Sequence, residues 1–533
     1  MKNHSDELIF HSQGLRRSAA NLADRIGEIA FANFTSRVFR AKRFDMEVKL
    51  GKTGEREAVL EILTGIREQG TYSHIAVKEM LDRCEREGMD RRQRAFVKRM
   101  TEGVIERRIE LDDVLRRYTK KGARIRPVIR DILRMGIFQI LYMDSVPDSA
   151  ACNEAVKLTK AYGKKELAGF VNGVLRTVVR EKEAGKLVPS TGEAADACAG
   201  HPAAGGSAGS PDGSTDPAAL SRRYSMPEWI VRMWQEQLGE QETEGLLAAL
   251  LQIRPVSIRF DDRCSLAERE TILEKMRLKG VGVEKGHYLP YCCYLTGTDS
   301  ISELPGYREG LWTVQDESSM MVAEAAGLEG GEIVYDVCAA PGGKSMHCAS
   351  RLLAIADEKG ERAGAGEVHA FDLSKGKTTQ ILKNVRRMHL SNVTVQQRDA
   401  RIPVPEEAGK ADVLLCDLPC SGLGVIGRKR DIKYHVTEKQ LEELSVLQKD
   451  ILRSAVPYLR KGGVLIYSTC TVNEGENGRI ADFIEKELGF TPDPIDGYLP
   501  EGIPGIKGNR LQLLPNVHGT DGFFLARFVK NNT

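Results

Sequence analysis

The chain has 533 residues, of which 41% are hydrophobic and 29% are charged, values typical of a folded globular protein and too apolar for a disordered one. Lysine and arginine (77) nearly balance aspartate and glutamate (75), so the formal charge of +2 gives no sign of a nucleic-acid partner. No run of about 18 apolar residues occurs, which excludes a membrane-spanning helix. The 11 cysteines lack disulfide-like spacing, which predicts free thiols and a cytoplasmic protein.

The N-terminal part of the chain divides into an extension and a helical domain. Residues 1–45 lack the apolar core of a secretory signal, and we expect an extension that is either disordered or the product of a start codon assigned too early. Over residues 46–189 apolar side chains recur at helical spacing, as in Ile129–Leu141 and Ala168–Val178, without any alternating strand pattern. This pattern predicts an all-α domain.

Residues 190–220 differ in composition from both of their neighbours. Ala, Gly, Ser and Pro fill 22 of the 30 positions between Ser190 and Ala219, without apolar periodicity. Because such a segment cannot bury a core, it predicts a flexible linker. After it, an amphipathic helix around Trp229–Trp234 and a strand at Val256–Phe260 predict a small α/β domain over residues 221–316.

Strand-like runs alternate with helical runs over residues 317–533. Alternation of this kind predicts a doubly wound, mostly parallel, Rossmann-like α/β sheet. Ligands bind such sheets at the C-terminal ends of the strands. The expected strands are Ile333–Val337, Val368–Leu373, Val393–Gln397, Val413–Leu418 and Val464–Ser468.

Glycines and acidic residues follow the first three of these strands. The segment Asp336–Lys344 leads through a glycine-rich turn into a helix whose first N–H groups can face a ligand, but it lacks the spacing of a dinucleotide site or a P-loop. Asp372 and Asp399 close the next two strands, where an acid can hold a ribose or meet an adenine amino group. Together these features predict a nucleoside ligand without phosphates, with S-adenosylmethionine as the candidate cofactor.

Two cysteines follow the fourth and fifth strands, Cys420 within Asp417–Gly422 and Cys470 within Tyr467–Thr471. In a parallel sheet these strand ends can be neighbours, so that the two thiols share a pocket. A thiolate that adds to C6 of a pyrimidine activates C5 toward a sulfonium methyl group, which favours methylation of cytosine at C5. Chain order alone does not decide which cysteine attacks, and the absence of further ligand spacing argues against a metal.

Three of these motifs resemble the signature motifs of the RNA (cytosine-5) methyltransferase family, namely Asp336–Lys344, Asp417–Gly422 and Ser468–Cys470. Two further segments match motifs of that family, Gln315–Ser319 and Leu514–Phe524. The N-terminal helices resemble a NusB-type RNA-binding domain, most clearly at Arg126–Tyr142 and Asn153–Arg176. The resemblance implies a NusB-like domain, a small α/β domain and a class I methyltransferase domain.

The resemblance also implies a role for each matching residue. Cys470 would be the nucleophile and Cys420 would help to release the product, while Asp417 would lie near both the methionine end of the cofactor and the target base. Asp372 would hold the ribose and Asp399 the adenine. The rest of the cofactor site would be lined by Cys338, Ala339, Ala340, Pro341, Gly342, Gly343 and Lys344. The sequence departs from the family at Leu418 and Arg430, where other members often carry Ala and Pro, and Arg430 is expected to alter RNA contact.

Basic residues supply candidate RNA contacts that the total charge conceals. Residues 51–190 hold 29 Lys and Arg against 21 Asp and Glu, and Arg107–Arg130 alone holds nine against three. Such a cluster fits an electrostatic footprint on RNA, and the linker would let the two ends of the protein grip separate RNA regions. The expected contact residues are Arg124, Arg126, Arg130, Arg428, Lys429 and Lys433.

The combined prediction is a cytoplasmic, monomeric, metal-free enzyme that methylates C5 of one cytosine in 16S ribosomal RNA through a covalent Cys–C6 adduct. The RNA would be unassembled or partly assembled into the small subunit. Two alternatives stay open, the same chemistry on transfer RNA and a non-catalytic NusB-type RNA-binding factor with an idle methyltransferase fold.

Overall fold

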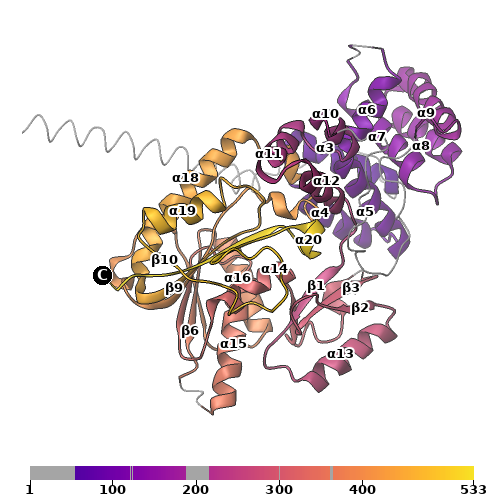
Figure 1. Cartoon of the computed structure of the whole chain (residues 1–533). Helices are drawn as coiled ribbons and strands as arrows, with labels where there is room; N and C mark the ends of the chain where they lie inside the picture. The colour runs from indigo at the N-terminus through magenta and orange to yellow at the C-terminus, as the bar shows by residue number, and fades with distance from the viewer. Residues whose placement is uncertain are drawn as a thin grey trace, which may run out of the picture.

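The computed structural model describes residues 54–187 and 215–532, apart from residues 121, 123, 299 and 361–363. The predicted extension and most of the predicted linker therefore lie outside the described residues. Figure 1 shows a helical domain in indigo and purple beside the short helices α10–α12, followed by a small sheet and a large sheet flanked by helices. The predicted multidomain fold, with its all-α first domain and doubly wound last domain, is confirmed.

The N-terminal domain is built around one apolar helix, α7 (Pro127–Tyr142), which begins at a proline suited to the first helical turn. Nearly all of its apolar side chains are buried by the surrounding helices. Gly136 permits close packing there, since a Cβ at this position would lie 2.7 Å from Leu175. The surrounding helices are α3 (Glu55–Gln69), α4 (Ser73–Arg86), α5 (Arg91–Glu106), α6 (Arg108–Arg117), α8 (Asp148–Ala161) and α9 (Ala168–Glu183).

Three short helices connect this domain to the rest, α10 (Pro217–Arg223), α11 (Glu228–Leu238) and α12 (Glu240–Leu250). Helix α10 begins at Pro217 with Asp216 as its cap, so the prediction that the linker extends to residue 220 is wrong at its C-terminal end. The helices bury Trp234 and Leu247 against Val472 and other residues of the catalytic domain. Helices α10–α12 therefore pack against the catalytic domain.

The small sheet is antiparallel throughout, with the strand order β2-β3-β1-β4. Its core is continuous with that of the catalytic domain through Trp312 and α14. The elements of this part are β1 (Val256–Phe260), α13 (Leu266–Leu278), β2 (Gly282–Lys285), β3 (Cys292–Thr296), β4 (Trp312–Val314) and α14 (Glu317–Ala326).

The large sheet has the strand order β10-β12-β9-β8-β5-β6-β7 among the described residues, with β11 paired to β12. The five neighbouring strands from β9 to β7 are parallel, and the order reverses between β5 and β8, the point at which such sheets bind ligands. The strands are β5 (Ile333–Asp336), β6 (Glu367–Asp372), β7 (Val393–Gln397), β8 (Ala411–Asp417), β9 (Leu459–Thr469), β10 (Thr491–Pro492), β11 (Arg510–Leu513) and β12 (Phe523–Val529).

Helices cover both faces of this sheet (Figure 1). Alternate residues of each strand point to opposite faces, so Val334 packs toward α14, α15 and α16 while Tyr335 packs toward α18 and α19. The remaining helices are α15 (Gly343–Lys359), α16 (Lys375–Arg387), α17 (Ile432–His435), α18 (Glu438–Ala455), α19 (Gly478–Lys486) and α20 (Pro515–His518).

The segment that follows Cys420 reaches across to the helical domain. Arg430 forms ion pairs with Glu102, at 3.1 Å, and with Glu106, at 2.9 Å, both on α5. The Asp431 carboxylate accepts a hydrogen bond of 2.6 Å from the backbone N–H of Ser73, at the start of α4. The helical and catalytic domains are therefore joined by direct polar contacts as well as by the chain that connects them.

Lys433 and Tyr434 extend the same contact. The side chain of Lys433 is buried and its ammonium donates to the carbonyl oxygen of Glu106 at 2.8 Å. Burial lowers the pKa of Lys433 to about 7, although the charge of Glu106 opposes the shift. The ring of Tyr434 lies 3.7 Å from the guanidinium carbon of Arg108. Because Lys433 is enclosed between the domains, the prediction that it binds RNA phosphates is not supported by its placement.

Replacing Arg430 by glutamate should separate the helical domain from the catalytic domain. Two partly buried ion pairs would become repulsive contacts, a loss of ~3 kcal/mol of docking free energy. Small-angle X-ray scattering should then give a larger radius of gyration than for the wild type. Adding Glu102→Arg to Arg430→Glu restores one ion pair and should bring the radius back, whereas an unchanged radius in Arg430→Glu would show that these pairs do not hold the domains.

Candidate active site

The two cysteines that follow β8 and β9 lie together. Strands β8 and β9 pair in parallel with Asp417 opposite Ser468, so the two strands end next to each other. The segments that follow them therefore leave the sheet side by side. The Sγ atoms of Cys420 and Cys470 are 3.5 Å apart, within range of a hydrogen bond between thiol and thiolate. The structure thus brings together the two thiols that the sequence placed on separate strands.

The electrostatic surroundings distinguish these thiols. The hydrogen bond from Cys420 lowers the pKa of Cys470, and the positive charges of Lys429 and Lys344 add to this, against burial and the Asp417 carboxylate. The same hydrogen bond, together with burial, raises the pKa of Cys420. Since the thiolate is the nucleophilic form of cysteine, this asymmetry favours Cys470 as the attacking group.

Asp417, at the end of β8, is held by two side chains. Its Oδ2 accepts a hydrogen bond of 2.7 Å from the Lys344 ammonium, and its Oδ1 accepts one of 2.9 Å from the Ser468 hydroxyl. Burial alone would lower the pKa of Lys344, but the Asp417 carboxylate, together with the charges of Cys470 and Asp336, outweighs burial and the pKa is raised. Lys344 therefore stays charged and fixes Asp417 beside the cysteines.

The predicted cofactor loop, residues 338–344, runs from β5 into α15. Gly342 has φ of 100°, a left-handed conformation that favours glycine, and a Cβ there would come within 3.2 Å of Ile381. Asp336 accepts a hydrogen bond of 2.5 Å from the Ser345 hydroxyl, while its Oδ1 is buried without a partner among the described residues. Burial, with the nearby Asp417 charge, raises the pKa of Asp336 to about 7.

Two further acids line the adjacent strand ends as predicted. Asp372 ends β6, and its carboxylate accepts from the backbone N–H of Ser374 at 3.0 Å and of Ala340 at 3.4 Å, which leaves acceptor capacity for hydroxyl groups. Asp399 follows β7 and is bound by Arg401, whose hydrogen bonds lower its pKa against burial. Carboxylates beside a glycine turn and a helix N-terminus fit a nucleoside that carries a sulfonium.

The Cys470 turn depends on two glycines in close contact. The backbone N–H of Gly424 donates to the carbonyl oxygen of Cys470 at 3.1 Å, and that of Gly522 donates to the carbonyl oxygen of Gly424 at 3.0 Å. A Cβ on Gly424 would lie 2.0 Å from the Gly522 oxygen and 2.9 Å from the Cys470 oxygen. These positions therefore admit only glycine without displacement of the catalytic turn.

Arg428 links three parts of the chain around the site. Its guanidinium pairs with Asp521 of the C-terminal motif at 2.6 Å and with Asp316 at the start of α14 at 2.8 Å. Against burial, the Arg428 charge lowers the pKa of Asp316, whereas burial and the Asp316 charge raise the pKa of Asp521 to about 7. The predicted RNA contact of Arg428 is therefore not supported, because both carboxylates already engage it.

The other predicted RNA contacts lie on the surface. Arg124, Arg126 and Arg130 are exposed near the start of α7. Lys429 is exposed as well, and its charge acts on His74 of the helical domain and on Cys470. Lys429 thus stands between the helical domain and the paired cysteines.

Two contributors to this site were missed by the sequence reasoning, Asp521 and Glu476. Asp521 lies within the C-terminal motif, so the motif match contained a signal. Glu476 is buried and accepts hydrogen bonds from Ser421, the residue after Cys420, but nothing in its local sequence reveals that partner.

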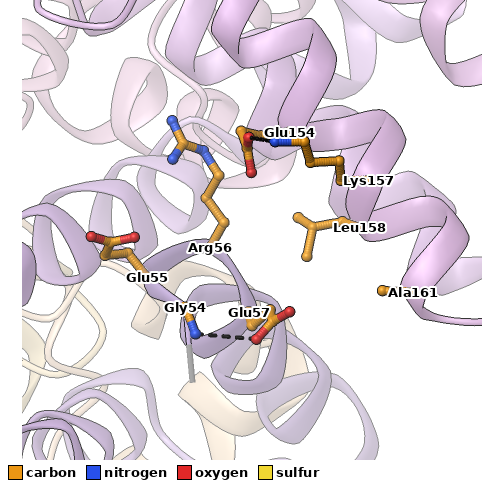
Figure 2. Close-up of a pocket in the computed structure, with 8 residues that line it drawn as sticks. All are labelled: Gly54, Glu55, Arg56, Glu57, Glu154, Lys157, Leu158 and Ala161. Carbon is orange, nitrogen blue, oxygen red and sulfur yellow. Dashed lines mark hydrogen bonds and ion pairs between the residues drawn. The ribbon is translucent and has the colours of Figure 1, made fainter. Parts of the chain in front are cut away.

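A separate pocket lies in the helical domain, between the start of α3 and α8, and contains none of the predicted site residues (Figure 2). It is lined by Gly54, Glu55, Arg56, Glu57, Glu154, Lys157, Leu158 and Ala161. In the described part of the chain, no three His, Cys, Asp or Glu side chains are grouped as metal ligands. No helix in the same ranges combines the length and apolarity needed to cross a membrane.

Comparison with known proteins matches each of the three structured parts. Residues 325–529 match the family model described as 16S rRNA methyltransferase RsmB/F. Residues 53–180 match the NusB family, and residues 226–302 match the ferredoxin-like domain of RsmF/B-like methyltransferases. A crystal structure of PH0851 has a TM-score of 0.68 at 22% identity and covers 91% of this chain and 100% of that chain, which supports the fold.

Curated relatives extend over almost the whole chain. A Bacillus subtilis protein named probable ribosomal RNA small subunit methyltransferase B is 33% identical over 490 residues, covering 90% of this chain and 99% of the relative. A Synechocystis protein of the same name is 31% identical and covers 89% of this chain and 99% of that relative.

The fold of the large sheet, the site at its strand ends and the matches to known families together define an S-adenosylmethionine-dependent RNA methyltransferase. More specifically, the chain belongs to the RsmB/F family of 16S rRNA methyltransferases, with a NusB domain at its N-terminal side. The family predicted from the sequence motifs is confirmed.

Replacing Gly424 by alanine should lower both stability and methyl transfer. The new methyl group would displace the Gly522 backbone and the Cys470 turn, a strain of ~2 kcal/mol in the free energy of unfolding. Gly173→Ala is the control, because this exposed helical glycine has no atom within 4 Å of a Cβ and should gain ~0.5–1 kcal/mol. Denaturant unfolding and an activity assay would measure both, and unchanged stability of Gly424→Ala would contradict the close-contact model.

Replacing Lys429 by glutamine should raise the pKa of Cys470, because a positive charge that favours its thiolate is removed. At a fixed pH below the new pKa, alkylation of Cys470 by iodoacetamide should slow, and the midpoint of its pH profile should move upward. Peptide mass spectrometry can follow this thiol alone. Lys275→Gln is the control, because Lys275 is exposed on α13 and its replacement should leave the pH profile of Cys470 unchanged. An unchanged profile in Lys429→Gln would show that the charge of Lys429 does not affect Cys470.

Proposed function

We propose that this protein transfers a methyl group from S-adenosylmethionine to C5 of a specific cytosine in 16S ribosomal RNA, as a cytoplasmic monomer that uses no metal. The observation that carries the proposal is the pair of thiols 3.5 Å apart at the ends of β8 and β9, since methylation of an amino group needs no cysteine. The family to which the chain belongs supports the ribosomal substrate.

The strand ends of β5, β6 and β7 would hold the methyl donor. Asp372 would accept from the ribose hydroxyls, Asp399 from the adenine amino group, and the turn at Gly342 would let the ligand approach the backbone. Asp336 and Asp417 would place negative charge near the sulfonium. The donor supplies an electrophilic methyl group, and the protein orients the cytosine toward it.

The cysteines would carry the covalent steps. The Cys470 thiolate forms a bond to C6 of cytosine, and the electrons of the C5–C6 double bond then bond C5 to the methyl carbon as the methyl–sulfur bond breaks. A base then takes the C5 proton, and the electrons of the C5–H bond re-form the C5–C6 double bond as the Cys470–C6 bond breaks and the Cys470 thiolate leaves. Cys420 would assist this release, a role that the 3.5 Å separation of its sulfur from that of Cys470 supports.

A cytosine must leave its stack to reach these thiols, so the substrate base would be flipped or single-stranded. Lys429 would meet a phosphate beside the target base, and the exposed Arg124, Arg126 and Arg130 would bind RNA at the surface near the start of α7. Because Arg430 and Lys433 fix that domain on the catalytic domain, both surfaces would act as one RNA-binding unit.

The test is transfer of radiolabelled methyl groups to 16S RNA from cells that lack this gene, with bisulfite sequencing to locate the product. Cys470→Ser should lose all transfer, because the weaker hydroxyl nucleophile cannot form the adduct. Cys420→Ala should instead accumulate a protein–RNA adduct that survives denaturation. Full activity of Cys470→Ser, or transfer to transfer RNA but not to 16S RNA, would overturn the proposal.

A further inference from the structure

The loop that carries Cys420 has no regular secondary structure and is held by one buried carboxylate, that of Glu476. Oε2 of Glu476 accepts a hydrogen bond of 2.8 Å from the backbone N–H of Ser421, and Oε1 accepts one of 2.6 Å from the Ser421 hydroxyl. Asn473 donates a third bond of 2.9 Å to Oε1. All three groups donate to the carboxylate, as an ionised acceptor requires.

The residue on the other side of Cys420 is held by the same cluster. The Gln448 amide donates to the carbonyl oxygen of Pro419 at 2.9 Å and also lies 3.4 Å from Oε2 of Glu476. The hydroxyl oxygens of Ser421 and Thr471 are 2.7 Å apart, which joins the Cys420 loop to the residue after Cys470. Cys420 is therefore fixed through both of its chain neighbours.

Cys470 is fixed by a different means. It follows β9 directly, and β9 pairs with β8 on one side and with β12 on the other, where Thr469 lies opposite Phe524. The sheet would keep Cys470 in place if Glu476 lost its bonds, whereas the Cys420 loop would lose its principal support.

We infer that Glu476 is a positioning residue that holds the Cys420 thiol against Cys470 and thereby sets the rate of product release more than the rate of attack. The inference rests on the proposed cytosine-5 chemistry, in which Cys470 attacks and Cys420 assists release. Glu476 holds the loop through hydrogen bonds to Ser421, Asn473 and Gln448, and its charge also helps to raise the pKa of Cys420.

Glu476→Gln is the sharpest variant, because glutamine has the same shape but replaces one acceptor oxygen by a donor that opposes Ser421 or Gln448. In single-turnover reactions with 16S RNA, the denaturation-resistant adduct should form at the wild-type rate. Its release should be about tenfold slower or more, as expected for loss of a hydrogen bond to a charged group. Equal slowing of both steps would overturn the inference.

Glu317→Gln is a matched control for the loss of a buried carboxylate. Glu317 is also buried and accepts backbone hydrogen bonds, from His287, Tyr288 and Leu289, but it lies in the small-domain junction. This variant should lower the melting temperature while leaving the ratio of release to formation at the wild-type value. A changed ratio in Glu317→Gln would mean that general destabilisation explains the effect of Glu476→Gln.

An RNA-free measurement separates this inference from the proposed function. Diamide should oxidise Cys420 and Cys470 of the wild-type protein to a disulfide, detected by peptide mass spectrometry, and should do so more slowly in Glu476→Gln because the thiols are less often in contact. An unchanged oxidation rate would refute the positioning role. Slower oxidation in the variant, with no methyl transfer by the wild type, would support positioning and refute the proposed function.

Discussion

The parallel pairing of β8 with β9 is the constraint on which the site depends. Register alone, with Asp417 opposite Ser468, places the two strand ends so that the following turns bring the cysteine sulfurs to 3.5 Å. A shift of one residue would move each side chain to the opposite face of the sheet. The buried residues on both faces of β8 and β9 oppose such a shift, so the packing of the core also fixes the positions of the residues that follow these strands.

The chain between Cys420 and α18 links this chemistry to the other domains. Its first part is bound by Glu476, its middle by the pairs of Arg428 with Asp316 and Asp521, and its last part by α5 of the helical domain. A displacement of the helical domain would therefore pull on the loop that carries Cys420. The contacts that hold the helical domain and those that hold the Cys420 loop therefore lie on the same stretch of backbone.

Much of this architecture could be predicted from the sequence because strands and helices leave periodic patterns. The five parallel strands and both cysteines could be predicted in this way, because the buried strands end at polar or reactive residues. The partners of charged residues could not be found. Arg428 and Lys433 look alike in a basic run, but one is paired with carboxylates and the other is buried between domains, and only the fold decides which partner each meets.

The same reasoning explains why Glu476 escaped notice. In a sheet of this kind, a carboxylate that contacts a ligand lies at the end of a strand, so the predicted strand order indicates its position. Glu476 acts through backbone and hydroxyl groups of a loop that is 55 residues away in sequence, so its position follows from the closure of the tertiary structure. In a site that needs two thiols with different pKa values, the distance between them must be held within a narrow range. Support for the loop that carries Cys420 is therefore a requirement separate from the nucleophile, although no motif of reactive residues identifies it.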